Sequence, residues 1–430
     1  MKLSFSLVVI VAIALPLLAI AAGPLPLAHP VRGEAFAAKL AGIDPDWNIS
    51  LAVEGKERVL ALPDLALWGS YRDASAGPQL LLADGSIVLA DVLDLGTDSV
   101  TIGDATGLGR ILWNESTLPL RQLTAILYQP SAESLERDKQ LERLYANERK
   151  EDEVWLLSGE IITGRVVSLP HYGRFLPPAP PPQAEVLKLS RRGVSEPLII
   201  PLAKVAALVF SAVQSPATKA RPSAWLGTNE GSLLSARKVT TEKDQVMIEL
   251  QGGGSLKVFM ETGDDDTPTF WDQVTLLQTT SPKVVYLSEL PGPAYKHIPF
   301  TSKEWPLGVD QNVLGGRLRT GEAVFLRGLG MHSASRVAYD LKGDEQRLEA
   351  LFALDERTKL HGSVIGKVLL ETEPGKWTTA WESPIVRGGD APLSISLPLR
   401  GARRLVLLVE FADRGDEWDH ANWLSARLVR

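Results

Sequence analysis

Close to its C-terminus the sequence reads Asp413-Arg-Gly-Asp-Glu-Trp-Asp-His-Ala-Asn-Trp423. This stretch leads into the apolar segment Leu424 to Val429. The stretch places four acids, a histidine, an amide and two tryptophans in a loop that contains a glycine. Loops held by a rigid sheet are where binding residues usually lie. We therefore expect this stretch to be the functional last loop of a β-sheet domain.

Upstream of this loop the chain alternates short apolar segments with turns that contain Gly, Pro or Asp. About eight or nine strands fill the region from residue 284 to residue 430, and their natural closure is a two-sheet antiparallel sandwich of jelly-roll type. The expected strands are residues 283–287, 327–331, 336–341, 348–353, 362–371, 378–381, 394–397, 404–411 and 423–429.

Five motifs follow one another in order within this region. They are Tyr286-Leu-Ser-Glu-Leu290, Gly328-Leu-Gly-Met-His-Ser333, Tyr339-Asp-Leu341, Ser383-Pro-Ile-Val-Arg-Gly-Gly-Asp390 and Asp419-His-Ala-Asn-Trp423. Together they resemble the NPCBM carbohydrate-binding module family over about a third of the chain. The resemblance implies a galactose-binding-like β-sandwich that binds sugar, of the kind that serves as an accessory module of glycoside hydrolases.

Two positions bear on what this resemblance implies. The family's last motif is usually D-H-A-D-W-A, whereas this chain has Asn422 and Leu424. The family's paired aspartates after the third long strand correspond to Asp355 and Glu356. Because an amide lacks the carboxylate charge, Asn422 would weaken any cation site that depended on this position.

Sugar recognition needs flat aromatic faces and planar polar groups that bond to vicinal hydroxyls. Trp418 lies between two acids and is the best stacking candidate, whereas Trp423 begins a strand and is expected in the core. His332 either points into the site or bonds the loop of His420. The other candidate tryptophans are Trp305, Trp377 and Trp381. The predicted carbohydrate-binding residues are His332, Asp355, Glu356, Arg387, Trp418, His420 and Asn422, with Asp390 as a further polar candidate.

The acids Asp413, Asp416 and Asp419 are spaced three residues apart around Gly415. They are either calcium ligands or a solvated acidic turn, since the full pattern of a calcium loop is missing. A structural calcium is thus the single candidate cofactor. No nucleophile elbow, zinc-protease motif, phosphate-binding loop or dinucleotide fingerprint occurs, so we do not expect an enzyme.

The N-terminus has the pattern of a signal peptide over residues 1–22. Lys2 precedes an apolar run, and Ala19-Ile-Ala21 offers the small residues that signal peptidase reads. The alternative is an uncleaved anchor, because the run is about long enough to span a bilayer. Either way we expect an exported protein, periplasmic, secreted or at the cell surface, that meets a membrane only if the segment is retained.

Between these ends the sequence predicts three tandem small barrels. The turn glycines Gly85, Gly159 and Gly231 lie about seventy residues apart, and Leu-Pro-Leu or Ile-Pro-Leu leads into the last strand of the first two copies. This pattern is typical of SH3-like or Sm-like barrels. The expected divisions are a leader and hairpin region (23–79), barrels at 80–130, 154–212 and 223–279, and a helix within 131–153.

Composition limits the partners. The chain is 45% hydrophobic and 23% charged, carries a net charge of −7 and has no cysteine. It therefore forms packed domains without disulfides, and it lacks the basic stripes that nucleic acid requires. Two hypotheses remain. Either the sandwich binds a polysaccharide or glycan, with the barrels as spacer or docking units, or the whole chain is a cell-envelope scaffold that binds proteins and no sugar.

Overall fold

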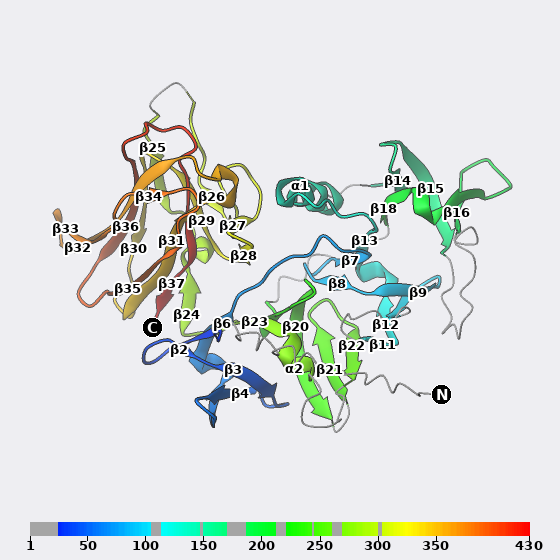
Figure 1. The fold of residues 1–430 in the computed structure, drawn as a ribbon, viewed down its shortest axis with the longest axis horizontal. Coiled ribbons are helices and arrows are strands. Elements are labelled where there is room, and N and C mark those ends of the chain that lie inside the picture. Colours follow the sequence, from blue (N-terminus) through cyan, green and yellow to red (C-terminus); the bar gives the residue numbers. More distant parts are fainter. Residues whose placement is uncertain are drawn as a thin grey trace, which may run out of the picture.

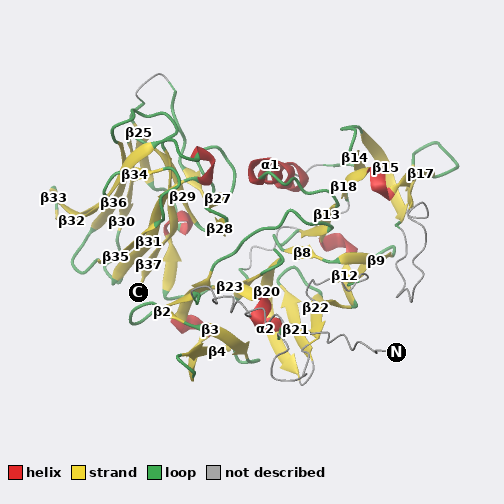
Figure 2. Cartoon of the chain, in the orientation of Figure 1, coloured by secondary structure: helices red, strands yellow, loops and turns green. Residues whose placement is uncertain are grey.

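The computed structural model describes residues 25–104, 113–146, 149–169, 186–211, 221–242, 245–259, 269–299 and 303–430. Strands dominate this part of the chain (Figure 1, Figure 2). The predicted signal segment lies outside the described residues. Across these ranges, the longest helix has 12 residues, and none is long and apolar enough to cross a membrane.

The N-terminal part comprises 23 strands, two short α-helices and three 3₁₀ turns in the described ranges. Its first elements are β1 (Leu27–Pro30), β2 (Phe36–Ala37), β3 (Lys39–Ile43), β4 (Asn48–Val53), β5 (Lys56–Ala61), η1 (Leu62–Asp64), β6 (Leu65–Gly69), β7 (Gln79–Leu82), β8 (Ile87–Leu89), β9 (Asp91–Leu95), β10 (Ser99–Gly103), β11 (Trp113–Asn114), β12 (Ser116–Pro119), η2 (Leu120–Gln122), β13 (Leu123–Leu127) and α1 (Ser134–Tyr145). They are followed by β14 (Asp152–Leu156), β15 (Ile161–Ser168), β16 (Val186–Ser190), β17 (Leu198–Pro201), η4 (Leu202–Lys204), β18 (Val205–Val209), β19 (Ala224–Thr228), β20 (Leu233–Glu242), β21 (Gln245–Leu250), β22 (Ser255–Phe259), α2 (Phe270–Gln273) and β23 (Val274–Thr279).

The repeated turns are where the sequence predicts them. Gly85, Gly159 and Gly231 have φ of 88°, 89° and 103°, in the left-handed region that glycine adopts without steric cost. Each joins two antiparallel strands. The motifs at Pro119 and Pro201 each lead through a 3₁₀ turn into a buried strand.

In the N-terminal part, strands of one repeat also pair with strands of another. β13 pairs with β7 on one side and with β18 of the next repeat on the other, and β8 pairs with β20 of the third. Seventeen strands are thereby joined in one hydrogen-bonded network. Closed SH3-like barrels as separate units are therefore not confirmed and stay a prediction.

The sandwich contains all nine predicted strands, within a few residues of the expected ends. Five further short strands, β25, β26, β27, β28 and β34, occur among the described residues. Its elements are β24 (Val284–Tyr286), η5 (Leu287–Glu289), β25 (Ala294–His297), β26 (Gly308–Val309), β27 (Leu318–Thr320), β28 (Ala323–Phe325), β29 (Gly328–His332), β30 (Ser335–Asp340), β31 (Arg347–Leu354), η6 (Glu356–Thr358), β32 (Ser363–Glu373), β33 (Lys376–Glu382), β34 (Val386–Arg387), β35 (Leu393–Pro398), β36 (Arg404–Phe411) and β37 (His420–Val429).

Two antiparallel sheets build the sandwich. One has the order β26-β29-β37-β31-β35, with β24 also paired to β37, and the other has the order β25-β30-β36-β32-β33. Alternation decides which side chains face inward. In β30, for example, Val337 and Tyr339 are buried while Arg336 and Asp340 are exposed. Trp423 is fully buried against Phe352 in this core, which confirms its predicted place.

Strand β37 is buried along its whole length. Ala421 and Trp423 face the core, and a bulge at Ser425, with φ of 47°, brings Ala426 and Leu428 to the core after it. The opposite, outer face carries polar side chains as well as apolar ones. This outer face of β37 comprises His420, Asn422, Leu424, Arg427 and Val429. Burial of these residues means that other parts of the chain cover both faces of the sheet.

The N-terminal part provides much of that cover. Val429 packs in one cluster with Val31 and Ala66, and the guanidinium of Arg347 donates to the carbonyls of Pro30 and Val31 at 3.0 and 2.9 Å. At a second point of contact, Val324 of β28 forms a β-bridge with Tyr71 of the N-terminal part. Figure 1 shows α1 lying between the sandwich and β13. The sandwich is thus docked against the N-terminal part rather than carried at the end of a free stalk.

Candidate ligand-binding site

The predicted site residues separate into three groups. The first lies at the end of the sandwich where β29 ends and β37 begins. His332 and His420 face each other directly across these two strands, with ring centroids 5.7 Å apart. Both are more than nine-tenths buried, at 3% and 6% exposure. The Nδ1 atoms of both lack a hydrogen-bond partner within the described residues.

Aromatic rings surround this histidine pair. The indole of Trp305 stacks on His332, with centroids 4.6 Å apart and an interplanar angle of 6°, and it lies 5.5 Å from His420. His297 packs edge-on against His332 at 5.7 Å. Lys303 places its ammonium 3.6 Å from the centre of the Trp305 ring. We call His297, Trp305, His332 and His420 the histidine–tryptophan cluster.

Trp418 lies at the rim of this cluster. It is 48% exposed, and its ring stacks on His361 at 5.7 Å and lies 6.1 Å from His420. Its φ of 63° is in the left-handed region, which a bulky residue rarely adopts. Such strain persists only where the surrounding structure enforces it, and it concentrates at ligand sites.

Burial sets the protonation of the cluster. It lowers the pKa of His332 and of His420 to about 4, so both rings are neutral at pH 7 and each can use a nitrogen as an acceptor. Burial also lowers the pKa of His297. The neighbouring Asp419 is fully buried, and burial raises the pKa of its carboxyl to about 6, while one oxygen accepts from the amide of Ser363 at 2.8 Å.

The second group of predicted residues lies at the same end of the sandwich but in a separate buried layer, and the amide of Asp355 donates to the carbonyl of His420 at 2.8 Å. Asp355 and Asn422 are buried under the loop before β27, where the Asn422 amide donates to Asp355 Oδ2 at 2.7 Å. Asn312 donates to the same oxygen at 3.3 Å, and the backbone of Arg357 donates to the other. The Oδ1 atom of Asn422 is left without a partner in the described part. Burial raises the pKa of Asp355 and of half-buried Glu356.

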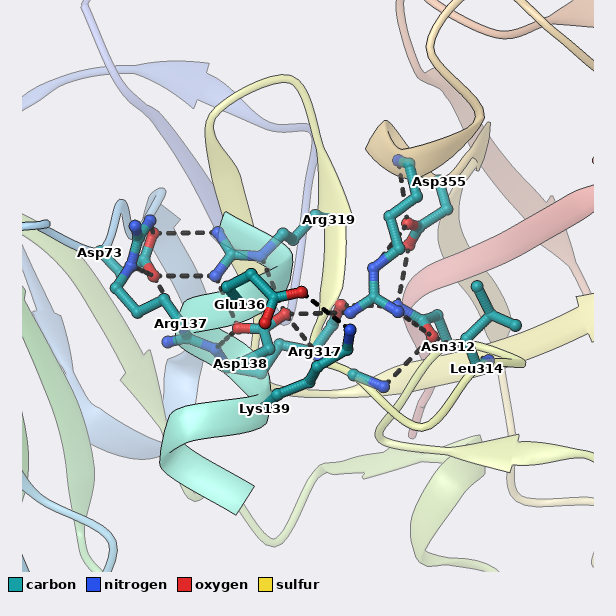
Figure 3. Close-up of polar contacts among 12 residues, drawn as sticks. Asp73, Glu136, Arg137, Asp138, Lys139, Asn312, Leu314, Arg317, Arg319 and Asp355 are labelled. Carbon is teal, nitrogen blue, oxygen red and sulfur yellow. Dashed lines mark hydrogen bonds and ion pairs between the residues drawn. The ribbon is translucent and has the colours of Figure 1, made fainter. Parts of the chain in front are cut away.

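Beyond Asp355 a charged network crosses to the N-terminal part (Figure 3). Arg317, Arg319 and Arg357 of the sandwich meet Asp138 of α1. Arg319 also bonds both oxygens of Asp73 at 2.9 and 2.8 Å, and Arg137 bonds the same two at 3.0 and 2.8 Å. We call these residues the docking network. They are Asp73, Arg137, Asp138, Arg317, Arg319 and Arg357.

The docking network is buried, and the carboxylates of Asp73 and Asp138 accept hydrogen bonds from its own arginines. Asp73, Asp138 and Arg319 have side-chain exposures of 7%, 3% and 2%. Burial opposes ionisation of the two carboxyls, but hydrogen bonds and charge from the arginines outweigh it and hold both pKa values below the usual range. The sequence did not predict this network, because charged side chains on a helix usually face solvent. The signal was present, since Arg137 and Asp138 lie one turn before the buried Leu141.

The remaining predicted residues lie at the rim. Arg387 makes a two-fold ion pair with Asp413, at 2.9 and 2.7 Å, and this pair lowers the pKa of the Asp413 carboxyl. Asp413 is exposed, Asp416 is half-buried and Asp419 is buried. Asp413, Asp416 and Asp419 thus have separate environments, and no three acids or histidines of the described ranges are grouped to hold a metal ion. The structure does not bring these three acids together, and the calcium site stays a prediction.

A family comparison agrees with the sandwich. Residues 283–429 match the model of the NPCBM/NEW2 domain. This segment is an NPCBM/NEW2 domain. The match covers about a third of the chain.

Individual relatives of the NPCBM domain are distant. A candidate endo-alpha-N-acetylgalactosaminidase of Renibacterium salmoninarum is 30% identical over 117 residues, which are 27% of this chain and 7% of that protein. The CBM51 module of a Clostridium perfringens GH95 protein, solved with methyl-galactose, is 21% identical with a TM-score of 0.30 and covers 34% of this chain and 99% of that one. The tandem CBM51 modules of a Streptococcus pneumoniae family 98 glycoside hydrolase are 14% identical with a TM-score of 0.29, over 94% of this chain and 99% of that one. Because both TM-scores are low, the family assignment depends on the domain match alone.

Proposed function

We propose that this chain is an exported, non-catalytic protein that binds a glycan at the histidine–tryptophan cluster of its NPCBM domain. One observation carries the proposal. Two buried histidines leave their Nδ1 atoms without a partner beside a stacked indole. Buried polar groups are nearly always bonded, so unpartnered ones next to an exposed aromatic ring favour a ligand with hydroxyl groups.

The chemistry of the cluster suits a sugar ring. Neutral imidazoles accept hydrogen bonds from hydroxyls, and the exposed face of Trp418 offers a flat surface for the C–H side of the ring. The paired Arg387 and Asp413 add fixed polar groups close by. The membership of residues 283–429 in a carbohydrate-binding module family supports the same function.

Export and the role of the N-terminal part complete the proposal. The apolar run and small residues within 1–22 support a signal peptide. The tandem barrels predicted upstream of the NPCBM domain would act as spacer or docking units. The docking network supports a rigid form of that role, in which the N-terminal part fixes the direction in which the cluster faces.

The experiment uses the full chain on a glycan array, followed by titration with the best ligand. Trp418→Ala is expected to weaken binding about tenfold or more, since loss of a stacked ring costs on the order of 1–3 kcal/mol. The matched control is Trp377→Ala on β33, which removes another partly exposed tryptophan, at 38%, far from the cluster. Equal losses in the two variants, or no glycan bound by the folded chain, would contradict the proposal.

A second function has an observation of its own. Leu157, Ile161 and Ile199 of the second repeat are 56%, 45% and 60% exposed. Exposed apolar side chains that gather on one unit favour a protein contact, as in a cell-envelope scaffold without sugar binding. That function predicts envelope proteins that co-purify with the chain and are lost on Ile161→Asp/Ile199→Asp, whatever glycan is present.

A further inference from the structure

A groove separates the first and second repeats of the N-terminal part. It has a volume of about 860 Å³ and is open to solvent. One wall is the turn between β9 and β10, with Gly96 and Thr97, and the other is formed by β15 and the end of β16. The groove is far from the histidine–tryptophan cluster, because the second repeat and the sandwich lie at opposite ends of the molecule (Figure 1).

Cations line this groove from three separate segments. Lys150 precedes β14, Arg165 lies on β15, and Arg191 and Arg192 follow β16. The register of the two strands pairs Arg165 with Ser190, so Arg165 lies next to the start of the arginine pair. All four side chains are exposed. Within the described ranges, no ion pair joins any of them to an acid.

The acids of the groove do not neutralise these cations. Asp152 is buried, and both its oxygens are occupied, Oδ2 by the amide of Val166 at 2.9 Å and Oδ1 by the amide and hydroxyl of Ser211 at 2.9 and 2.8 Å. Glu151 is the one exposed acid among the lining residues. The groove is therefore a local cationic site on a chain with a net charge of −7.

The lining also indicates what kind of anion fits. Phe210 is its single aromatic residue and is only 5% exposed. Neutral sugars and single-stranded bases are both held largely by stacking on exposed rings, which this groove lacks. Guanidinium groups instead bind planar oxyanions through paired hydrogen bonds. Because the groove is open to solvent and its cations come from three segments, it suits a polymer that carries such groups at intervals.

We propose that this groove binds an acidic polysaccharide whose sugar units carry carboxylate or sulfate groups. The site is independent of the histidine–tryptophan cluster and uses charge where the cluster uses rings and imidazoles. Two glycan contacts on one rigid chain would raise the avidity for a polymer without any change in either site.

The test measures binding of the full chain to polygalacturonate, dextran sulfate and neutral dextran by affinity electrophoresis and titration. Arg191→Glu/Arg192→Glu is expected to weaken binding of the acidic polymers at least about tenfold, because two charge-assisted contacts become repulsive. Polygalacturonate and dextran sulfate separate the carboxylate from the sulfate form of the ligand. Arg165→Gln is a milder second variant, for which a smaller loss is expected with no change of fold.

The control Arg336→Glu/Arg400→Glu changes the net charge equally through exposed arginines of the sandwich, and it should leave binding intact. Trp418→Ala should also leave binding of polygalacturonate unchanged, which keeps this result separate from the neutral-glycan site. Absence of binding to both acidic polymers, an equal loss in the control, or tighter binding of oligo-dT through the same arginines would overturn the proposal.

Discussion

The outer face of β37 meets two environments within three residues. His420 lies in the histidine–tryptophan cluster with an unpartnered Nδ1, whereas Asn422 donates to Asp355 in the buried layer that leads to the docking network. Both residues belong to one motif and both are polar. The difference lies in what covers them, which is the rim loops over His420 and the loop before β27 over Asn422.

This difference separates groups that keep hydrogen-bonding capacity for a ligand from groups that are already bonded within the protein. Every carboxylate oxygen of Asp73 and Asp138 already accepts at least one hydrogen bond from an arginine, so neither acid has capacity for a ligand. The two histidines have that capacity, because each keeps a nitrogen free. A polar residue close to a site can therefore bind a ligand only through a donor or acceptor that the protein does not already occupy.

The largest expected effect comes from breaking the docking network at Arg319. Arg319→Met leaves Asp73 and Asp138 buried with fewer counter-charges, and removal of one partner from a buried pair typically costs about 3–5 kcal/mol. We expect the free energy of unfolding in urea at pH 7 to fall by that amount.

The matched control for this change is Arg72→Ala. Arg72 pairs with Glu322 at 2.7 Å across the same interface, but the two side chains are 66% and 77% exposed. An exposed pair contributes about 0–1 kcal/mol, so its loss should hardly move the transition. If both variants lose the same stability, burial does not distinguish the docking network from an ordinary surface contact.

Asn422→Asp should give the next largest effect. It sets a second carboxylate where the amide now donates to Asp355 at 2.7 Å, and like charges in a buried site cannot both ionise. We expect a loss of about 2–3 kcal/mol at pH 7. Because the pair would hold a proton with a raised pKa in the folded state, the loss should shrink as the pH falls from 7 to 5.

Asn422→Ala is the control for this variant, since it removes the hydrogen bond without adding a charge. Its loss should change less with pH than that of Asn422→Asp, because it removes one donor to Asp355 and adds no second carboxylate. An equal pH dependence in the two variants would show that the two carboxylates do not interact, and that Asp355 is better solvated than its burial implies.

Acid should next weaken the histidine–tryptophan cluster. The folded pKa of His332 and His420 is about 4, below the ordinary value of 6.5, so the unfolded chain binds more protons between these pH values. Stability is therefore fully present above about pH 6.5 and is lost as the pH falls toward 4. Each histidine accounts for on the order of 2 kcal/mol at pH 5.

His332→Gln and His420→Gln should each flatten the pH dependence of unfolding between pH 7 and 5. Asp419 acts in the opposite sense, because its folded pKa of about 6 is raised and its buried carboxyl becomes more favourable as the pH falls. Asp419→Asn should therefore make the free energy of unfolding fall more steeply as the pH drops from 7 to 5. An unchanged slope in both histidine variants would mean that the imidazoles are hydrated in the folded chain.

The sandwich could be predicted from sequence because its signals are local. Alternation placed strands such as β36 and β37, and the ordered motifs around His332 and His420 identified the family. The docking network had only a partial signal, because the place of Arg137 and Asp138 on the same face of α1 as Leu141 indicates burial but names no partner. Asp138 and Arg319 are 181 positions apart, and each alone is typical of a solvated charge. Only the tertiary structure turns Asp355 and Asn422 from expected sugar ligands into parts of a buried layer.

The smallest effect on stability should come from Trp418→Ala. The ring is half-exposed, and Ala keeps the same left-handed backbone constraint, so the free energy of unfolding should change by about 0.5 kcal/mol or less. A small change in stability together with a large loss of glycan affinity would show that the Trp418 ring serves ligand binding and not the stability of the fold. A loss as large as that of Arg319→Met would instead make the stacking of Trp418 on His361 part of the fold.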